Sequence, residues 1–195
     1  KTDGMSFRCL VTGATGYVGG RLVRELLAKG HSVRVLARTP EKLRDFPWVD
    51  QIEVVQGDAG DQAAVAEAMQ GIDVAYYLLH SLQEGANLEA AETAIARSFA
   101  EAARGSALRR IVYLGGLAPD ISMQDMSPHM RSRVQVGQIL RDSGIPTAEF
   151  RAAVIIGSGS ASFEMLRYLT ERLPAMITPR WVRTKTQPIA IRDVL

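Results

Sequence analysis

Residues Leu10 to Gly20 read LVTGATGYVGG, and this stretch decides the fold. An apolar run over residues 7–11 leads into it, and from Val18 onward apolar residues recur at helical spacing. Three glycines lie between the two segments in the pattern G-x-x-G-x-x-G: Gly13, Gly16 and Gly19. The stretch therefore predicts a β-strand, a tight turn and an α-helix in direct succession.

Each glycine of this pattern has a task where a strand meets a helix. The first permits the tight turn, the second lets the backbone approach a pyrophosphate, and the third lets the helix pack closely on the sheet. Free amides at the start of the helix then face the phosphates. We predict that the turn binds a dinucleotide through six residues: Thr12, Gly13, Thr15, Gly16, Tyr17 and Val18.

The same alternation of strand and helix continues along the chain. Apolar or β-branched runs predict strands over residues 32–38, 52–58, 72–81, 109–117 and 147–157, and helical spacing or capping residues predict helices over 61–71, 88–102, 127–144 and 161–174. Such an order is typical of an α/β doubly wound parallel sheet with helices on both faces and right-handed crossovers. Sheets of this class bind ligands outside the carboxyl ends of their strands.

We expect a dinucleotide-binding core over residues 1–157 and the start of a small substrate-side region over residues 158–195. The last nine residues, QPIAIRDVL, show no closing element, which indicates a shortened chain or a missing piece. In the stretch GSGSASFE, backbone amides are suited to an anionic substrate, and Ser162 is a candidate helix cap with Glu164 in the first turn. The composition of an ordinary loop explains that stretch as well.

Bulk composition narrows the functional classes. The chain has 195 residues with 23 Lys and Arg against 21 Asp and Glu, and a net charge of +2 argues against a nucleic-acid partner. No apolar run reaches the roughly 20 residues of a membrane span, and the N-terminus lacks a signal peptide, so we expect a cytoplasmic protein. The single cysteine, Cys9, excludes an internal disulfide and a cysteine-based metal cluster, and we expect no metal site. A homodimer is left open.

Arg38 ends the second predicted strand, 19 residues after Gly19. An NAD site places an acidic residue near this position to hold the ribose hydroxyl, whereas arginine suits a 2'-phosphate. The cofactor predicted is therefore NADP rather than NAD. The alternative interpretation of Arg38 is a solvated surface arginine.

Other strand ends supply the rest of the predicted cofactor site. Asp58 is suited to accept a hydrogen bond from the adenine amino group or to cap the next helix. His80 is a candidate proton relay or an ordinary structural donor. The remaining residues of the set follow or end neighbouring strands: Ala59, Leu79, Ser81 and Gly115.

Several motifs together resemble the extended and atypical short-chain dehydrogenase/reductases. These are TGATGYVGG, VLAR, the GD after the third strand and IVYLGGL, and the resemblance is to NmrA-like and complex I subunit-like members. The stretches MSPHMRSR, FRAAVIIGSGSASFEM and RLPAMITPRWV resemble in particular the bacterial epimerases or oxidoreductases that carry a further C-terminal domain. The resemblance covers nearly the whole chain. It implies an NADP-binding Rossmann fold, with a substrate site built by the region after the sixth strand.

The sequence departs from the family's catalytic pattern. Standard members use a Ser or Thr at the end of the fifth strand and a Tyr-x-x-x-Lys on the next helix. Here the strand ends in Gly115-Gly116, and His129 and Arg133 hold the Tyr and Lys places. One helical turn puts these two side chains on the same face. His129 is then a candidate general acid, and Arg133 a candidate ligand of the ribose or of a substrate anion.

Two functions follow from these patterns. The first is an NADP(H)-dependent oxidoreductase or epimerase acting on a small substrate. The second is a protein that binds NADP(H) without turnover, as a redox sensor or structural partner, and it is motivated by the absent Ser, Tyr and Lys.

Overall fold

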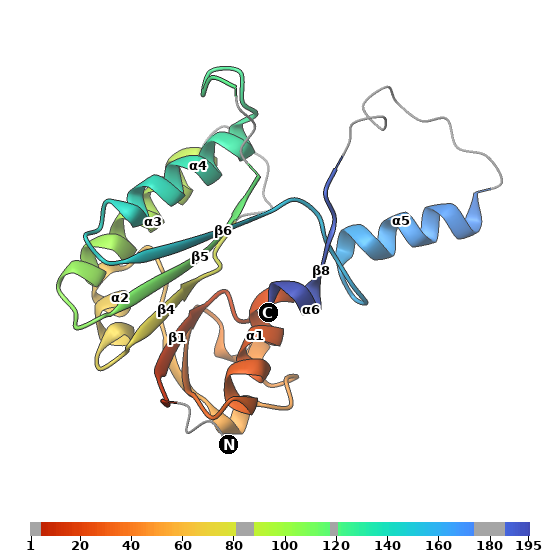
Figure 1. Cartoon of the computed structure of the whole chain (residues 1–195). Coiled ribbons are helices and arrows are strands. Elements are labelled where there is room, and N and C mark those ends of the chain that lie inside the picture. Colours follow the sequence, from red (N-terminus) through yellow and green to blue (C-terminus); the bar gives the residue numbers. More distant parts are fainter. Residues whose placement is uncertain (1–4, 81–87, 118–120, 174–185) are drawn as a thin grey trace. The chain divides into compact units, whose positions relative to one another are not determined.

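The computed structural model describes residues 5–80, 88–117, 121–173 and 186–195 (Figure 1). The chain divides into two compact units, Lys1–Arg151 and Ala152–Leu195. The described helices include none that is both long and apolar enough to cross a membrane.

The first unit is built on a six-stranded sheet in the order β3-β2-β1-β4-β5-β6. Pairing is parallel from β3 through to β5. The strands are β1 (Arg8–Thr12), β2 (Ser32–Ala37), β3 (Glu53–Gln56), β4 (Val74–Tyr77), β5 (Arg110–Gly116) and β6 (Thr147–Ala152). The strand order reverses direction between β1 and β4, and open parallel sheets bind ligands at such a switch point. The predicted doubly wound fold is confirmed.

Helices cover both faces of this sheet (Figure 1). They are α1 (Tyr17–Ala28), α2 (Gln62–Met69), α3 (Leu88–Arg104) and α4 (Pro128–Arg141), with short 3-10 helices η1 (Pro40–Leu43) and η2 (Val49–Gln51) after β2. Successive strand side chains point to opposite faces. Leu10 and Leu36 accordingly join the core under α2, α3 and α4, while their neighbours Val11 and Val35 are fully buried on the other face.

Aromatic side chains form the centre of the core below α3 and α4. Tyr77 on β4 meets Phe99 of α3 and Tyr113 of β5 edge to face, with ring centroids 5.0 and 5.9 Å apart. All three rings are buried. Edge-to-face pairs of this kind add about 0.5–1.5 kcal/mol each beyond the burial of their area. The packing of these rings therefore supports β4 and β5.

Two local predictions are corrected. The fourth strand ends at Tyr77, not at residue 81, because Leu78 leaves the sheet and donates its amide to the Thr12 hydroxyl (3.4 Å). The predicted strand over 147–157 is two strands, β6 and β7 (Ile155–Ile156), because β7 pairs in a separate sheet. Its partner there, β8 (Ile189–Ala190), leads into the short helix α6 (Ile191–Val194).

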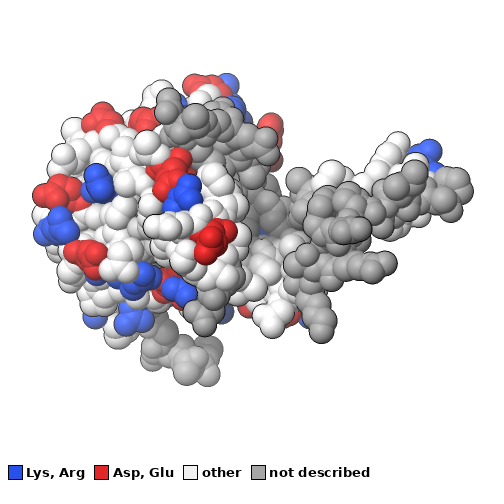
Figure 2. All heavy atoms as spheres, turned by 90° about the horizontal axis from the view of Figure 1, so that it is seen from above, with Lys and Arg blue, Asp and Glu red and all other residues white. Residues whose placement is uncertain are grey.

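The second unit also contains α5 (Ala161–Arg172). Ser160, not Ser162, holds the N-cap position, because the helix begins two residues earlier than a cap at Ser162 requires. The Ser160 hydroxyl donates to the Ile155 carbonyl (3.1 Å), and Glu164 accepts from the Gly159 amide (3.0 Å). Acidic and basic side chains are interspersed on the face in Figure 2, as the near-neutral net charge leads one to expect.

Candidate functional site

The glycine turn lies where β1 enters α1, at the switch point of the sheet. Gly13 has φ +77°, a conformation that favours glycine, and a Cβ there would stand 2.9 Å from the Leu78 carbonyl oxygen. A Cβ on Gly19 would collide with the carbonyl oxygen of Gly13. Gly13 is therefore required because the turn approaches the end of β4 closely. Gly19 is required because α1 approaches the turn closely.

The start of α1 is suited to an anion. Gly16 is the N-cap and brings no side-chain cap, so the first-turn amides, Tyr17 and Val18 among them, keep their hydrogen-bonding capacity. The helix dipole adds positive potential at the same point. Thr15 and Gly16 are exposed at the rim of the turn. The residues present thus fit the pyrophosphate of a dinucleotide.

Thr12 has a structural task in this arrangement. Its side chain is fully buried, and its hydroxyl donates to the Tyr76 carbonyl (3.0 Å) while accepting from the Leu78 amide. This bridge joins β1 to β4 directly below the turn. The side chain of Tyr17 is also engaged, because the Arg21 guanidinium stacks 3.9 Å from the centre of its ring.

Arg38 and Asp58 meet at the other end of the predicted cofactor site. The Arg38 guanidinium lies 3.7 Å from the Asp58 carboxylate, and both side chains are largely exposed. Asp58 also accepts from the Gly60 amide (2.7 Å). The cap of α2 is Asp61, which accepts from the Ala63 amide (2.9 Å), so the capping alternative for Asp58 is wrong.

The other predicted cofactor residues differ in their surroundings. Ala59 is buried in the core, and Leu79 packs against that core from its edge. Ser81 lies outside the described residues. Because the methyl group of Ala59 packs in the core, Ala59 is suited to face a ligand only through its backbone groups.

His80 follows β4 at the carboxyl edge of the sheet. Its Nδ1 lies 3.4 Å from the Leu78 carbonyl oxygen, which itself abuts the glycine turn. His80 is exposed. Nearby protein atoms withdraw water from the ring and lower the pKa of His80 from 6.5, and the positive charge of Arg133 lowers it further. The imidazole is therefore neutral at neutral pH, able to donate at one nitrogen and accept at the other.

Helix α4 begins as the sequence predicts. Ser127 caps it by accepting from the Met130 amide (3.3 Å), and Pro128 occupies the first turn. His129 is exposed in that turn, and Arg133 is half-buried one turn later. The charges of both residues act on His80, which places the three side chains in one electrostatic neighbourhood.

Arg133 lies over the end of β5. A Cβ on Gly116 would stand 3.8 Å from Arg133 Cγ, and the Tyr113 hydroxyl donates to the Arg133 carbonyl (3.1 Å). Burial raises the pKa of Tyr113, which keeps this hydroxyl a donor. The structure thus brings His80, the His129 turn and Arg133 to the strand ends where the family's catalytic groups are expected.

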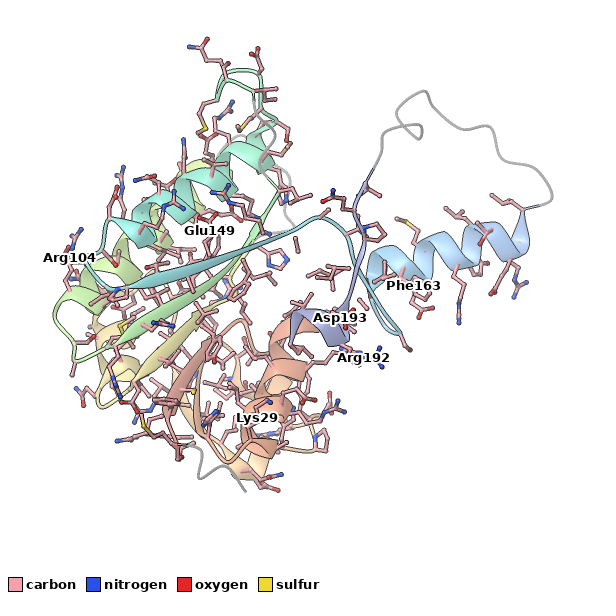
Figure 3. The ribbon with its side chains drawn as sticks, viewed as in Figure 1. Lys29, Arg104, Glu149, Phe163, Arg192 and Asp193 are labelled. Atoms are coloured by element: carbon pink, nitrogen blue, oxygen red, sulfur yellow. The ribbon has the colours of Figure 1, made fainter. Side chains whose placement is uncertain are left out.

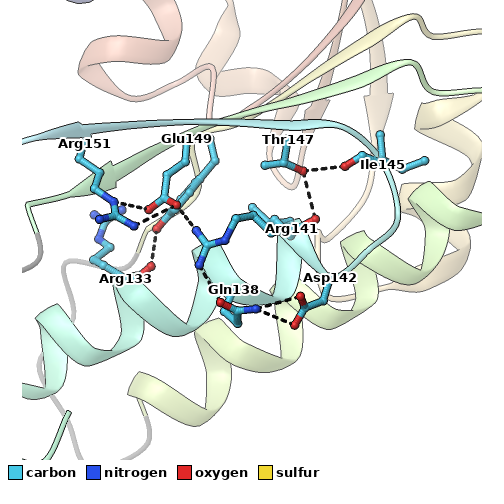
Figure 4. A network of polar contacts seen from close by, with 10 residues as sticks. Arg133, Gln138, Arg141, Asp142, Ile145, Thr147, Glu149 and Arg151 are labelled. Atoms are coloured by element: carbon cyan, nitrogen blue, oxygen red, sulfur yellow. Dashed lines mark hydrogen bonds and ion pairs between the residues drawn. The ribbon is translucent and has the colours of Figure 1, made fainter. Parts of the chain in front are cut away.

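Gly115 faces the carboxylate of Glu149, a residue of β6. A Cβ on Gly115 would come within 3.3 Å of Glu149 Oε1, and one on Gly137 within 3.0 Å. Glu149 lies between β6 and α4, where Arg141 and Arg151 pair with it (Figures 3 and 4). The absence of a side chain at Gly115 therefore makes room for an ion-pair network that joins α4 to the sheet.

A polar seam between α3 and α4 holds α4 in place, and no sequence pattern predicted it. Arg131 Nε donates to both carboxylate oxygens of Glu89 (3.1 and 3.0 Å), and Gln135 donates to the same group (2.8 Å). Ser132 donates to Glu92, and both of these residues are buried. The only available signal was the spacing of Arg131 and Gln135 by one helical turn, which does not identify a partner 42 residues away.

The strand order, the glycine turn and the uncapped helix α1 define a dinucleotide-binding Rossmann-like domain. A sequence profile described as NAD(P)H-binding matches residues 13–153, most of the chain. The chain therefore belongs to the NAD(P)H-binding family, in agreement with the predicted resemblance to atypical short-chain dehydrogenase/reductases.

Among curated proteins, the chain is similar to (4-alkanoyl-5-oxo-2,5-dihydrofuran-3-yl)methyl phosphate reductase of Streptomyces griseus subsp. griseus. The two are 36% identical over 138 residues, which are 70% of this chain and 44% of the relative. The chain spans less than half the length of these curated relatives.

Solved structures support the fold. The Bordetella bronchiseptica enzyme WbmH, in complex with NAD+, superimposes with a TM-score of 0.77 at 19% identity, over 97% of this chain and 70% of that one. The NADPH-dependent quinone oxidoreductase QOR2 of Escherichia coli, complexed with NADPH, gives 0.62 at 26% identity, over 75% of this chain and 49% of that one.

Proposed function

We propose that this chain is the cofactor-binding part of an NADP(H)-dependent oxidoreductase that reduces a carbonyl group of a small substrate. The observation that carries the proposal is that the glycine turn and His80 both lie against the carbonyl oxygen of Leu78. A reductase and an NADPH-dependent quinone oxidoreductase among the similar proteins support the same class of reaction.

The residues divide into two tasks. The turn from Gly13 to Val18 would hold the pyrophosphate through backbone amides, and Arg38 would hold the 2'-phosphate that distinguishes NADP from NAD. Asp58 would share Arg38 with that phosphate and accept from the adenine amino group. NADPH, when bound, supplies a hydride.

The proton comes from this chain. The His129 imidazolium would donate a proton to the substrate oxygen, which becomes a hydroxyl once the carbonyl carbon has received the hydride. His80, held neutral, would orient that oxygen by a hydrogen bond. Arg133 occupies the place of the family's lysine, one helical turn from His129 on the same face.

The proposal is tested with NADPH deuterated at the transferable position and a panel of small carbonyl compounds and quinones. We expect deuterium in a reduced product, and a fall in turnover for His129→Asn of about 100-fold, within the range for loss of a general acid. NADPH binding with no transfer to any compound, unchanged by His129→Asn, would favour a binder without turnover. A redox sensor is tested by partner capture with the NADP+-bound and the NADPH-bound protein. A sensor should retain a partner in one of these two forms and not in the other.

A further inference from the structure

We infer that Phe46 and Trp48 are positioning residues for the cofactor. They fix the place of Arg38 relative to the glycine turn, and this fixed spacing favours NADP(H) over NAD(H). The inference rests on the proposed function, which assigns the 2'-phosphate to Arg38. Its geometric part lies wholly in the first unit, in the segment 39–51 and the first turn of α1.

Arg38 is a one-residue link between two fixed points of the backbone. Before it, Ala37 ends β2, and the Ala37 carbonyl accepts from the Gly57 amide (3.1 Å). After it, Thr39 is the N-cap of η1, and the Thr39 carbonyl accepts from the Lys42 amide (3.1 Å). The place of the Arg38 guanidinium therefore depends on where η1 lies as well as on the sheet.

The segment that follows Arg38 is a succession of hydrogen-bonded turns. Leu43 is fully buried at the end of η1, and its carbonyl accepts from the Phe46 amide (3.0 Å). The Phe46 carbonyl in turn accepts from the amide of Val49, the first residue of η2 (3.1 Å). Through these bonds, the position of η2 constrains the position of η1.

Phe46 and Trp48 anchor this segment on the first turn of α1. Their rings stack, with centroids 4.6 Å apart and planes inclined by 25°. Trp48 is buried, and its Nε1 donates to the Gly20 carbonyl (3.0 Å). A buried indole N–H needs such an acceptor, because leaving it unpaired is unfavourable. Gly20 makes room for the stack, since a Cβ there would stand 2.7 Å from Phe46 Cε1.

This anchor lies next to the pyrophosphate end of the predicted cofactor site. Gly20 directly follows Gly19, and its amide donates to the carbonyl of Gly16, the N-cap of α1 (3.0 Å). The segment 39–51 thus begins beside Arg38 and is fastened to the helix turn whose amides are suited to the pyrophosphate. We call the contact of Phe46 and Trp48 with Gly20 the clasp.

The two phosphate sites that the clasp connects would serve one nucleoside. In NADP the pyrophosphate and the additional phosphate are attached to the 5' and 2' positions of the same ribose, so their spacing is fixed by covalent bonds. A protein that holds both sets of donors at the matching spacing loses little freedom when the cofactor binds. NAD has no 2'-phosphate and needs the turn alone. Loosening the clasp should therefore weaken the binding of NADPH more than that of NADH.

The test compares two variants of the clasp by calorimetric titration with NADPH and with NADH. Trp48→Phe removes the N–H donor and keeps an aromatic ring, and Phe46→Leu removes the stacked ring. Each should lower the affinity for NADPH by about 3- to 10-fold and leave that for NADH within about twofold. Phe7→Leu is the matched control, because Phe7 is also half-buried and contacts another ring, that of His31, at 5.6 Å. It should bind both nucleotides as the parent protein does.

Equal losses of NADPH and NADH affinity would overturn the inference, because the two rings would then support only the turn that both nucleotides share. Unchanged affinities in both clasp variants would overturn it too. A parent protein that binds NADPH no more tightly than NADH would instead count against the cofactor assigned in the proposed function.

Amide hydrogen exchange tests the clasp without any nucleotide. The Lys42 and Phe46 amides donate within the segment, and Trp48→Phe should speed their exchange by about fivefold or more. The amides of β5 serve as the internal reference for global unfolding, and their exchange should rise less. Phe7→Leu should show no such difference between the segment and β5. If Trp48→Phe and Phe46→Leu also showed none, the fixed spacing would be refuted whichever nucleotide the parent protein prefers.

Discussion

The guanidinium of Arg38 and the carboxylate of Asp58 lie 3.7 Å apart, each just beyond the end of one of the neighbouring strands β2 and β3. Both side chains are largely exposed, and an exposed pair of this kind contributes little to stability. Its interest lies in recognition, because a 2'-phosphate would compete with Asp58 for Arg38.

Arg38→Gln should therefore lower the affinity for NADPH by about 10-fold or more and leave the affinity for NADH within about twofold. Asp58→Asn should raise the affinity for NADPH, because it removes a negative charge from the phosphate site. Fluorescence titration of both nucleotides against both variants measures these changes. Equal losses for NADPH and NADH in Arg38→Gln would mean that Arg38 does not contact the 2'-phosphate.

Gly19→Ala should abolish dinucleotide binding and lower the free energy of unfolding by about 1–3 kcal/mol, the usual effect of overpacking. The added methyl group would collide with the Gly13 carbonyl and push α1 away from the turn. Gly105→Ala is the control, since the nearest atom to a Cβ there is the Ala102 carbonyl oxygen at 3.7 Å. Denaturant unfolding and NADPH titration check both variants. Binding retained in Gly19→Ala would show that the turn tolerates displacement.

Ser132→Ala should destabilise the first unit by about 1–3 kcal/mol, because it removes a hydrogen-bond donor from a buried carboxylate, Glu92. Ser122→Ala provides the comparison: its hydroxyl bonds Asp125 at an exposed position, and its loss should change stability by about 0.5 kcal/mol or less. Urea unfolding of the two variants gives the difference. If both lost the same stability, the seam between α3 and α4 would carry no special weight.

The sheet and the cofactor turn were predictable because their signals are local. Apolar runs and the spacing of Gly13, Gly16 and Gly19 depend on residues a few positions apart, and the structure places β1, the turn and α1 accordingly. The caps at Asp61 and Ser127 are local in the same sense, although only that of Ser127 was assigned correctly.

The failures arose where tertiary contacts decide. β7 separates from β6 because its partner is β8, 34 residues further along the chain, and no local pattern identifies that pairing. The length of β4 was overestimated because the Leu78 amide donates to the Thr12 hydroxyl and the Leu78 carbonyl contacts the glycine turn. The ion pairs of Arg131 and Arg141 on α4 depend on glutamates of α3 and β6, so no local pattern predicted them.

His80 should titrate below 6.5, and Arg133→Gln should raise its pKa toward that value by removing a nearby positive charge. Because the pKa of the folded state is lowered, the unfolded chain binds the proton more readily. His80 therefore leaves stability unaffected above pH 6.5 and reduces it as the pH falls from 6.5 through the pKa of the folded state. NMR titration of the histidine ring protons, assigned with His80→Asn, measures the shift. A pKa at or above 6.5 would contradict the desolvation by nearby protein atoms and the effect of the Arg133 charge on this ring.

Cys9 offers a test of the core that is independent of any ligand. Burial raises the pKa of its thiol from 9.0 to about 11, and the charge of Asp73 adds to the effect. The folded thiol stays protonated longer than the unfolded one, so its contribution to stability is complete below pH 9.0 and is lost as the pH rises toward 11. At pH 8 the native chain should react very slowly with a thiol reagent, whereas the unfolded chain should react at its single cysteine. Rapid reaction of the native protein would show that β1 opens to solvent. In that case bound NADPH should slow the reaction, because β1 leads into the glycine turn.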